Sequence, residues 1–429
     1  MKFFLFTILF LSALSSCISG HAVSHFIYVN KKGQFVRDEK PYYFIGTNFW
    51  YGAIIGSEGE GGNRIRLCRE LDYLKSIGVE NLRVLVGADG ENGVQAHVEP
   101  SLQIAPNVYN DTILAGLDFF MNELRKRKMT AVLYLNNSWE WSGGYSAYLE
   151  WMGYGKIVNS ATNGWSAYMN YVKRFLSSDS AKALFAEHVR YIVTRTNRYS
   201  QIRYVDDPTI MSWQIGNEPR AFSEENKELL CEWLSSVAAL IKSLDPNHLI
   251  SSGSEGKQGC EQDLMLFEKI HSNSNIDYLT IHIWPYNWQW IKADSLEENL
   301  LQAKENTKKY IEEHLSVARK CKKPLVLEEF GFPRDSLAFS KKSHTFCRDE
   351  YYQFVFDIIC RQRKNEGLLS GCNFWAWGGF ANLNSTHTYW KKGDDYTGDP
   401  PQEEQGLNSV FATDHTTIQI IKTNSKMLE

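Results

Sequence analysis

The stretch TIMSWQIGNE, residues 209–218, sorts its side chains into two sets with the two-residue period of a β-strand. The small or polar set is Ser212, Gln214, Gly216 and Glu218, and the bulky apolar set is Met211, Trp213 and Ile215. In a barrel strand, one side faces the interior and the other faces a layer of helices. The stretch therefore predicts a strand whose C-terminal end carries an inward-facing carboxylate, Glu218.

Seven further short apolar stretches alternate with helical patterns along the chain. They are YYFIGTN (42–48), NLRVLVG (81–87), TAVLYLN (130–136), HLISSG (248–253), YLTIHIW (278–284), PLVLEEFG (324–331) and GCNFWAWGG (371–379). Eight strands alternating with helices predict an α/β fold, a single (β/α)8 TIM barrel. No repeat, low-complexity tract or linker divides residues 25–429, so we expect one domain. An open doubly wound sheet stays an alternative, because periodicity alone does not show closure.

Polar and aromatic side chains share one face near the C-terminal ends of several of these strands. The sets are Gly46, Asn48 and Trp50; Asn81, Arg83 and Leu85; Thr280, His282 and Trp284; and Asn373, Trp375 and Trp377. Barrel enzymes hold their active sites at this end, so we predict a site there. Each residue alone has a structural alternative: Arg83 could form an interior salt bridge with Glu218, and His282 and Trp375 could be ordinary core residues.

Composition and charge limit the classes of ligand that the chain is expected to bind. The net charge is -4 and the charged residues are mixed along the chain, so no basic stripe predicts nucleic-acid binding. The Gly-rich run at 56–64 lacks the Lys-Ser/Thr ending of a phosphate loop. Aromatic residues make up 14% of the chain, and many stand in expected loops. This surplus favours a site that stacks flat, partly apolar ligands such as sugar rings.

The N-terminus predicts an export signal. Lys2 precedes FFLFTILFLSAL, an apolar run too short to span a bilayer, and small residues follow. We expect residues 1–20 to be a signal peptide and the mature chain to be exported. The stretch LSSC (14–17) also resembles a bacterial lipobox. The alternatives are therefore a secreted protein and a periplasmic or outer-membrane lipoprotein anchored through Cys17.

Seven cysteines remain beyond the signal: Cys68, Cys231, Cys260, Cys321, Cys347, Cys360 and Cys372. Seven cannot all pair within one chain, and no Cys/His cluster has metal-ligand spacing. We expect mainly buried thiols, with one or two disulfides as the alternative.

A second acidic position lies in PLVLEEFG, where Glu328 and Glu329 are adjacent. Neighbouring side chains of a strand point to opposite sides, so we expect only one of the two to face the interior, and parity leaves open which. Cleavage of a glycosidic bond requires two carboxylates across a barrel mouth. One protonates the leaving oxygen, and the other attacks the anomeric carbon or activates water.

Five motifs together resemble glycoside hydrolase family 5, in the clan of retaining (β/α)8 barrel glycosidases. They are Arg83, GNEP (216–219), His-Ile-Trp (282–284), Glu-Phe-Gly (329–331) and FWAWGG (374–379). The stretches GTNFWYG (46–52), NNSWEWSGG (136–144), GNEPRAF (216–222) and EEQGLNSVF (403–411) are similar to its endo-β-1,4-mannanase branch. The resemblance spans residues 25–415. It implies an endo-acting retaining hydrolase of β-1,4-mannosidic bonds in mannan, glucomannan or galactomannan.

The same resemblance assigns the two catalytic roles. Glu218 matches the general acid/base and Glu329 the nucleophile, with Glu328 turned toward the helix layer or a salt bridge. A glycosyl-enzyme on Glu329 would be hydrolysed with net retention, and the carboxyl groups would lie about 5 to 5.5 Å apart. No metal or organic cofactor is implied.

Supporting roles follow from the resemblance as well. Asn217 matches the residue that bonds the sugar 2-hydroxyl, Arg83 would hold Glu329 ionised, and His282 would position the acid/base. Trp284 departs from the pattern, because many members have a tyrosine there that donates to the nucleophile. An indole N–H would donate from a different place, so this contact stays open.

The substrate-facing roles are those of aromatic residues and one arginine. Trp375 would stack under the sugar at the attacked carbon, and Trp50 and Trp139 would form neighbouring walls. Arg220 matches a position that reaches a sugar on the leaving-group side. Ser138 is an insertion relative to the commoner Asn-Asn-Trp, which leaves the geometry of the subsites open.

Other functions stay open at this point. A cellulase and an exo-mannosidase would use the same site, because the sequence does not reveal whether loops close one end of the groove. A catalytically silent polysaccharide-binding protein is the alternative from another class. The expected partner is a β-mannan polysaccharide or manno-oligosaccharide, bound by a monomer. Membrane contact is expected only through the N-terminal lipid anchor.

Overall fold

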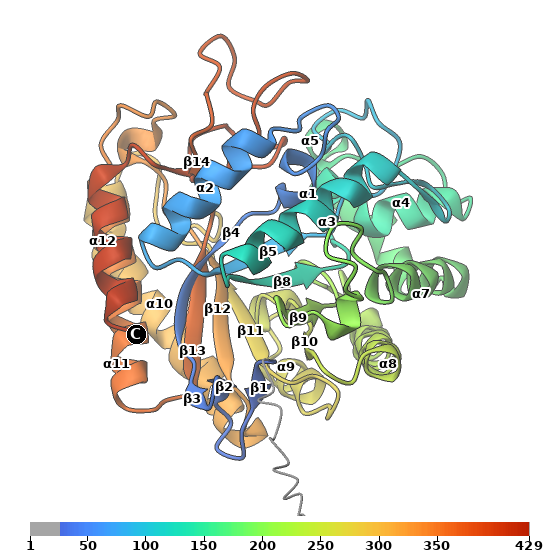
Figure 1. Cartoon of the computed structure of the whole chain (residues 1–429), viewed down its shortest axis with the longest axis horizontal. Helices are drawn as coiled ribbons and strands as arrows, with labels where there is room; N and C mark the ends of the chain where they lie inside the picture. Colours follow the sequence, from blue (N-terminus) through green and yellow to red (C-terminus); the bar gives the residue numbers. More distant parts are fainter. Residues whose placement is uncertain (1–25, 429) are drawn as a thin grey trace, which may run out of the picture.

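The structure, a computed structural model, describes residues 26–428. Its centre is one sheet of eight strands in the order β10-β9-β8-β5-β4-β13-β12-β11 (Figure 1). In chain order these are β4 (Phe44–Asn48), β5 (Asn81–Leu85), β8 (Thr130–Tyr134), β9 (Ile210–Gln214), β10 (Leu249–Ser251), β11 (Leu279–Ile283), β12 (Leu325–Phe330) and β13 (Leu369–Phe374). Every pairing between them is parallel.

The two outer strands of this sheet, β10 and β11, meet and close the barrel. The Asp277 N–H donates to the Ile250 carbonyl at 2.8 Å, and the His282 N–H donates to the Glu255 carbonyl at 3.2 Å. The side chain of Thr280 adds a bond to the Ser254 carbonyl at 2.9 Å. The predicted barrel is confirmed, and the open doubly wound sheet is wrong.

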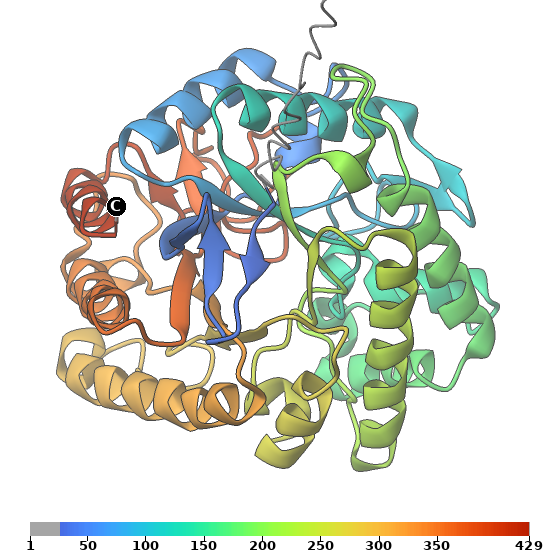
Figure 2. The ribbon, with the colours of Figure 1, turned by 60° about the horizontal axis from the view of Figure 1, so that its bottom comes forward.

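Helices surround the strands as an outer wall (Figure 2). The long helices are α2 (Arg64–Ser76), α3 (Asp111–Lys126), α7 (Asp179–Val193), α8 (Lys227–Leu244), α10 (Leu296–Cys321), α11 (Phe346–Lys364) and α12 (His415–Lys426), and the shorter α9 (Leu264–His271) completes the ring. Their apolar faces pack on the outward side chains of the strands in one continuous core. Helix α3 shows the sequence features that favour the two ends of a helix. The side chain of Asn110 caps its N-terminus, and the basic residues Arg125 and Lys126 lie in its last turn.

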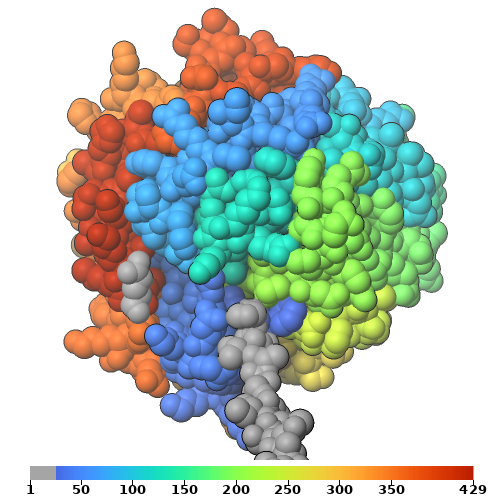
Figure 3. Space-filling model, viewed as in Figure 1, coloured from blue at the N-terminus to red at the C-terminus, as the bar shows by residue number. Residues whose placement is uncertain are grey.

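The remaining elements cover the two ends of the barrel. A three-stranded antiparallel sheet of β1 (Tyr28–Val29), β2 (Phe35–Arg37) and β3 (Lys40–Pro41) crosses the base (Figure 2). There, Phe35 packs edge to face against Tyr278. At the opposite end lie α1 (Gly52–Ile55), β6 (Gln103–Ala105), β7 (Val108–Tyr109), α4 (Gly144–Trp151), α5 (Ser160–Asn163), α6 (Trp165–Val172), β14 (Trp377–Gly379) and β15 (Val410–Phe411). Residues 380–409, between β14 and β15, rise above the rest of the molecule (Figures 1 and 3).

Every strand is shorter than the stretch that predicted it or is shifted from it, and two of them differ most. The stretch 209–218 is a strand only as far as Gln214, and the stretch 371–379 breaks after Phe374 into a separate strand that pairs with β15. The export signal at 1–20, with the alternative lipidation of Cys17, lies outside the described residues. All seven cysteines within residues 26–428 are free thiols, so the disulfide alternative is wrong there. No helix in that range is both long enough and apolar enough to cross a bilayer.

Candidate active site

A cavity of about 570 Å³ opens at the C-terminal ends of the barrel strands, within the range usual for small-ligand sites. Its predicted lining residues are Trp139, Asn217, Glu218, Arg220, Trp284, Glu329 and Trp375. Two other predicted residues, Arg83 and His282, lie beneath its floor, fully shielded from solvent. Residues from strands far apart in the sequence thus meet in one cavity, as barrel closure requires.

Glu329 ends the inner face of β12 and is held by two donors. Arg83 Nη1 donates to its Oε1 at 2.5 Å, and Trp284 Nε1 donates to its Oε2 at 3.2 Å. Trp284, which stands where a tyrosine is commoner, therefore still supplies a hydrogen-bond donor to the Glu329 carboxylate. Only 3% of Glu329 is exposed, so these contacts act with little screening by water.

The expectation that Glu328 and Glu329 point to opposite sides is wrong. Glu328 also faces the barrel interior, where Gln214 Nε2 donates to it at 2.6 Å and Arg83 Nε lies 3.6 Å away. The salt bridge is therefore present, and the placement toward the helix layer is not. The pairing of β11 with β12 shifts register so that His282 faces Glu329, and this irregularity breaks the strict alternation.

Glu218 follows β9 in an unusual backbone conformation. Its φ is +51°, in the left-handed region, so it enters the cavity from a turn rather than from the strand itself. His282 Nδ1 lies 2.7 Å from its Oε1, and Trp139 Nε1 donates to its Oε2 at 2.5 Å. A carboxylate oxygen of Glu218 and one of Glu329 lie within 4.8 Å of each other.

The surroundings of the two carboxyl groups favour one proton between them. Burial raises the pKa of Glu218 and of Glu329, and two negative charges at this separation repel. Glu329 contacts a guanidinium directly, whereas Glu218 does not, so the charge is favoured on Glu329 and the proton on Glu218. Burial also lowers the pKa of His282 well below its usual range, so this ring stays neutral.

Arg83 organises the floor of the cavity. Besides Glu329, its guanidinium donates to Asn217 Oδ1 at 2.8 Å, Gln214 Oε1 at 2.8 Å and Asn48 Oδ1 at 3.1 Å. The alternative pairing with Glu218 is wrong. Since Asn217 Oδ1 is taken by Arg83 and its Nδ2 reaches Asn137 Oδ1 at 3.1 Å, the side chain is held at the cavity wall in one orientation.

Three of the four predicted tryptophans line the cavity, and one does not. Trp375 and Trp284 meet edge to face with ring centres 5.8 Å apart. Trp139 lies beside Glu218, to which its Nε1 donates. Trp50 is the exception: only 1% of it is exposed, and its Nε1 donates to the Gly398 carbonyl at 2.8 Å. The expectation that Trp50 forms a wall is therefore wrong, because it packs in the core against Tyr51, Trp141 and Tyr396.

Sequence reasoning missed several cavity residues. Glu255, two residues after a strand-like stretch, pairs with Arg220 through contacts of 2.5 Å. Its place near a strand end was a usable signal. Gln402 and Glu403 come from the segment between β14 and β15, and no periodic pattern places such a long connection. Burial, followed by the charges of Asp399, Glu404 and Glu218, raises the pKa of Glu403 to about 8.

Gly253 holds the backbone of Glu218, and its replacement should be costly. Its φ is +79°, its carbonyl accepts the Glu218 N–H at 3.0 Å, and an added Cβ would lie 1.8 Å from the Gly216 oxygen. We expect Gly253→Ala to lower the free energy of unfolding by about 3 kcal/mol or more, through backbone strain and overlap together.

Gly153→Ala is the matched control, because Gly153 has a φ of +83° and open space around it. It should cost only about 1 kcal/mol. Urea unfolding of both variants measures the difference. Equal losses would contradict the close contact at Gly253.

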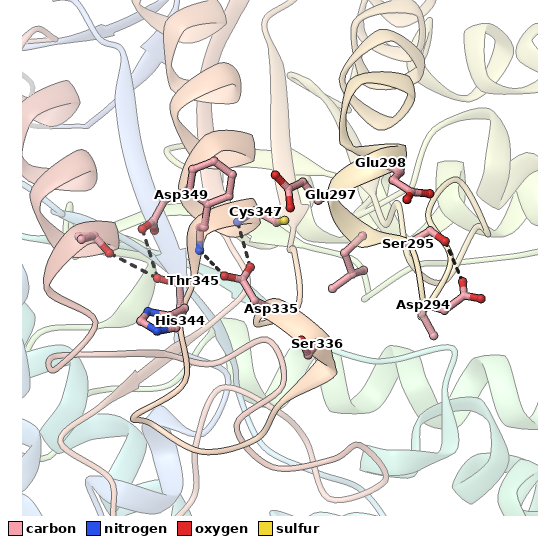
Figure 4. Close-up of a pocket in the computed structure, with 14 residues that line it drawn as sticks. Asp294, Ser295, Glu297, Glu298, Asp335, Ser336, His344, Thr345, Cys347 and Asp349 are labelled. Carbon is pink, nitrogen blue, oxygen red and sulfur yellow. Dashed lines mark hydrogen bonds between the residues drawn. The ribbon is translucent and has the colours of Figure 1, made fainter.

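A second, larger cavity of about 990 Å³ lies at the N-terminal ends of α10 and α11 (Figure 4). Two of its acidic side chains bond to neighbouring groups: Asp335 accepts the N–H groups of Phe346 and Cys347 at 2.8 and 3.0 Å, and Ser295 donates to Asp294 at 3.0 Å. It shares no lining residue with the cavity of Glu218 and Glu329.

Comparisons with known proteins agree with this geometry. The model of the family described as GH family 5 beta-mannosidase-like matches residues 24–429. The chain is similar to a glycoside hydrolase family 5 mannosidase from Rhizomucor miehei, with 32% identity over 95% of this chain and 98% of that chain and a TM-score of 0.85. One structure of a mutant of that mannosidase is a complex with mannosyl-fructose.

Curated relatives and a further structure extend the comparison. The mannan endo-1,4-beta-mannosidase 3 of Arabidopsis thaliana is 28% identical over 365 residues, which cover 81% of each chain. The endo-1,4-beta-D-mannanase of Thermotoga petrophila RKU-1 has a TM-score of 0.66 at 22% identity, covering 90% of this chain and 99% of that one. The latter likeness concerns the fold alone.

Proposed function

The chain belongs to glycoside hydrolase family 5, in its β-mannosidase-like group, and from this membership we infer that it cleaves β-1,4-mannosidic bonds in mannan with retention of configuration. One observation carries the proposal: two buried carboxyl groups with oxygens within 4.8 Å of each other, of which only Glu329 touches a guanidinium. The carboxyl groups of retaining glycosidases lie about 5 to 5.5 Å apart, whereas inverting enzymes need about 6.5 to 9.5 Å.

The contacts of the two carboxyl groups indicate which step of the reaction each of them performs. Glu218, which holds the proton, protonates the leaving oxygen while the Glu329 carboxylate attacks the anomeric carbon. Glu218 then removes a proton from water, which displaces Glu329 from the same face as the departed group. Arg83 and Trp284 orient Glu329 for the attack, and His282 and Trp139 orient Glu218.

Internal cleavage is the form of this activity that we propose first. The curated relatives with matching length are named mannan endo-1,4-beta-mannosidases. We propose that Trp375 stacks under the sugar at the attacked carbon, that Asn217 bonds its 2-hydroxyl, and that Arg220 reaches the leaving-group side. All three side chains line the cavity, and this supports the proposal.

Removal of terminal mannosyl units is a second candidate, favoured by the segment 398–405. Gln402 Oε1 and Glu403 Oε2 are buried at the cavity, and neither has a hydrogen-bond partner among residues 26–428. Asp399 fixes this segment by accepting the N–H groups of Gly406, Asn408 and Ser409 at 2.8, 2.9 and 3.2 Å. A fixed wall with unpartnered polar groups suits recognition of the hydroxyl groups at a chain end.

Product patterns separate the two candidates. With mannohexaose and β-mannan as substrates, the first proposal expects mannobiose to mannotetraose as early products and a rapid fall in mannan viscosity. Mannose as the sole early product, with viscosity unchanged, would instead support the second. Chromatography of time points before a tenth of the substrate is consumed measures this, with galactomannan, cellulose and xylan as comparison substrates.

Two other results would contradict both internal cleavage and the removal of terminal mannosyl units. Cleavage of cellulose in preference to mannan would make the chain a cellulase. Binding to mannan without any bond cleavage would make it a polysaccharide-binding protein.

A further inference from the structure

The loop after β10 contacts the environment of Glu218 through its backbone. The Gly253 carbonyl accepts the Glu218 N–H at 3.0 Å, and the Glu255 carbonyl accepts the His282 N–H at 3.2 Å. The hydroxyl of Tyr310 also donates to the Glu255 carbonyl at 2.8 Å. One loop therefore fixes the backbone of Glu218 and that of the histidine that contacts its carboxyl group.

The side chain of Glu255 reaches the same carboxyl group through two intermediates. Nε and Nη2 of Arg220 both lie 2.5 Å from Glu255 Oε2. The guanidinium of Arg220 lies over Trp139, with its carbon 5.2 Å from the ring centre, and Trp139 Nε1 donates to Glu218 Oε2. The exposed fractions are 3% for the Glu255 side chain and 19% for that of Arg220, so water screens the pair weakly.

We propose that Glu255 is a positioning residue for Glu218: it holds Arg220 against Trp139 and offsets the charge of that arginine beside the acid/base carboxyl group. The proposal rests on the proposed function, because it assigns Glu255 a part in the proton transfer of the same site. The contacts from Glu255 through Arg220 and Trp139 to Glu218 would also fit a purely structural role. The test therefore removes the charge of Glu255 while keeping the size of its side chain.

The charges around Glu218 set the expected effect. The ionisable groups that face it are Arg83, Tyr134, Arg220, Glu255, His282, Glu329 and Glu403. Burial raises the pKa of Glu218, and the charge of Arg220 is the largest influence in the opposite direction. Two further groups near Glu255 stay neutral, since burial raises the pKa of Cys260 to about 12 and that of Tyr310 well above its usual range.

The sign of the pH effect follows from the role of Glu218. A general acid works only while protonated, so kcat/KM falls as the pH rises through the Glu218 pKa. If Glu255 loses its charge, Arg220 acts without compensation and one repelling negative charge disappears. Both changes favour ionised Glu218, so its pKa decreases and the basic limb moves to lower pH.

The experiment is the pH dependence of kcat/KM for mannotetraose in the full mature protein. We expect the basic limb of Glu255→Gln to lie roughly one pH unit below that of the wild type. The limb of Arg220→Gln should move to higher pH, and the double variant should return close to the wild type because both charges are gone. Glu313→Gln is the matched control: Glu313 pairs with Lys257 near the same loop, and its loss should leave the limb in place.

The outcomes separate the two proposals. Reduced activity at every pH with an unmoved limb in Glu255→Gln would make Glu255 purely structural and overturn the inference. Melting temperature and near-UV circular dichroism report whether each variant folds. If Glu255→Gln does not fold, Arg220→Gln decides, because an unmoved or lowered limb contradicts the inference. An inactive wild type would contradict the proposed function itself.

Discussion

Glu329→Ala should lower kcat/KM for mannotetraose by roughly 10⁵-fold, the largest effect of any single replacement in this protein. The variant lacks the carboxylate that forms the covalent intermediate, and no other described acid occupies its place beside Arg83 and Trp284. Initial rates at several substrate concentrations measure the loss, and the melting temperature shows whether the fold is kept.

Glu328→Gln is the matched control for this result. Glu328 is equally buried and also lies near Arg83, yet a glutamine there can keep the contact with Gln214. It should therefore retain measurable hydrolysis. An active Glu329→Ala beside an inactive Glu328→Gln would exchange the two assignments on β12.

Glu218→Ala should show a loss that depends on the leaving group. With mannotetraose, whose leaving sugar needs a proton, kcat/KM should fall by roughly 10³-fold. With dinitrophenyl β-mannoside, whose leaving group departs as a stable anion, formation of the glycosyl-enzyme should change little. Hydrolysis of that intermediate then becomes slow, because water lacks its base, so a burst of dinitrophenol should precede the steady state.

Azide adds a test of the geometry, because this anion needs no base. In Glu218→Ala it should restore turnover and give β-mannosyl azide, since it attacks the intermediate from the face that the leaving group left. In Glu329→Ala the α-anomer is expected, because azide then replaces the nucleophile itself. The same anomer from both variants would contradict the proposed arrangement of the two carboxyl groups.

The barrel could be predicted from the sequence because its signal is repeated in every strand. In 209–218 the alternation correctly placed Ser212 and Gln214 inside, and equivalent alternation placed Arg83 and His282 beneath the site. Met211 is an exception: it was expected to face the helices, yet it packs with Leu249 and Val326 at the base of the barrel interior, where the pairing of β8 with β9 shifts register. The alternation of side chains along a strand depends only on that strand. Each stretch therefore gave independent evidence for the same barrel interior.

The parts that could not be predicted depend on departures from regular strands. Glu218 enters the cavity through a left-handed residue after β9 ends, and Glu328 turns inward where the register shifts. Trp50 was misplaced because Tyr396 and Gly398 hold it in the core, and the long connection that carries them has no periodic signal. Glu255 belongs to the same class, because its role depends on a partner, Arg220, on another loop.

The three-stranded sheet at the base of the barrel sets the orientation of any protein attached to the N-terminus. The first described strand, β1, lies under the N-terminal ends of the barrel strands, where Ile27 and Phe35 pack against Leu249 and Val326. Glu218 and Glu329 open at the opposite pole. A surface, resin or fusion partner joined through the N-terminus would therefore leave the mouth facing outward, toward an insoluble polysaccharide, whereas a partner joined near residues 380–409 would stand in the way of that substrate.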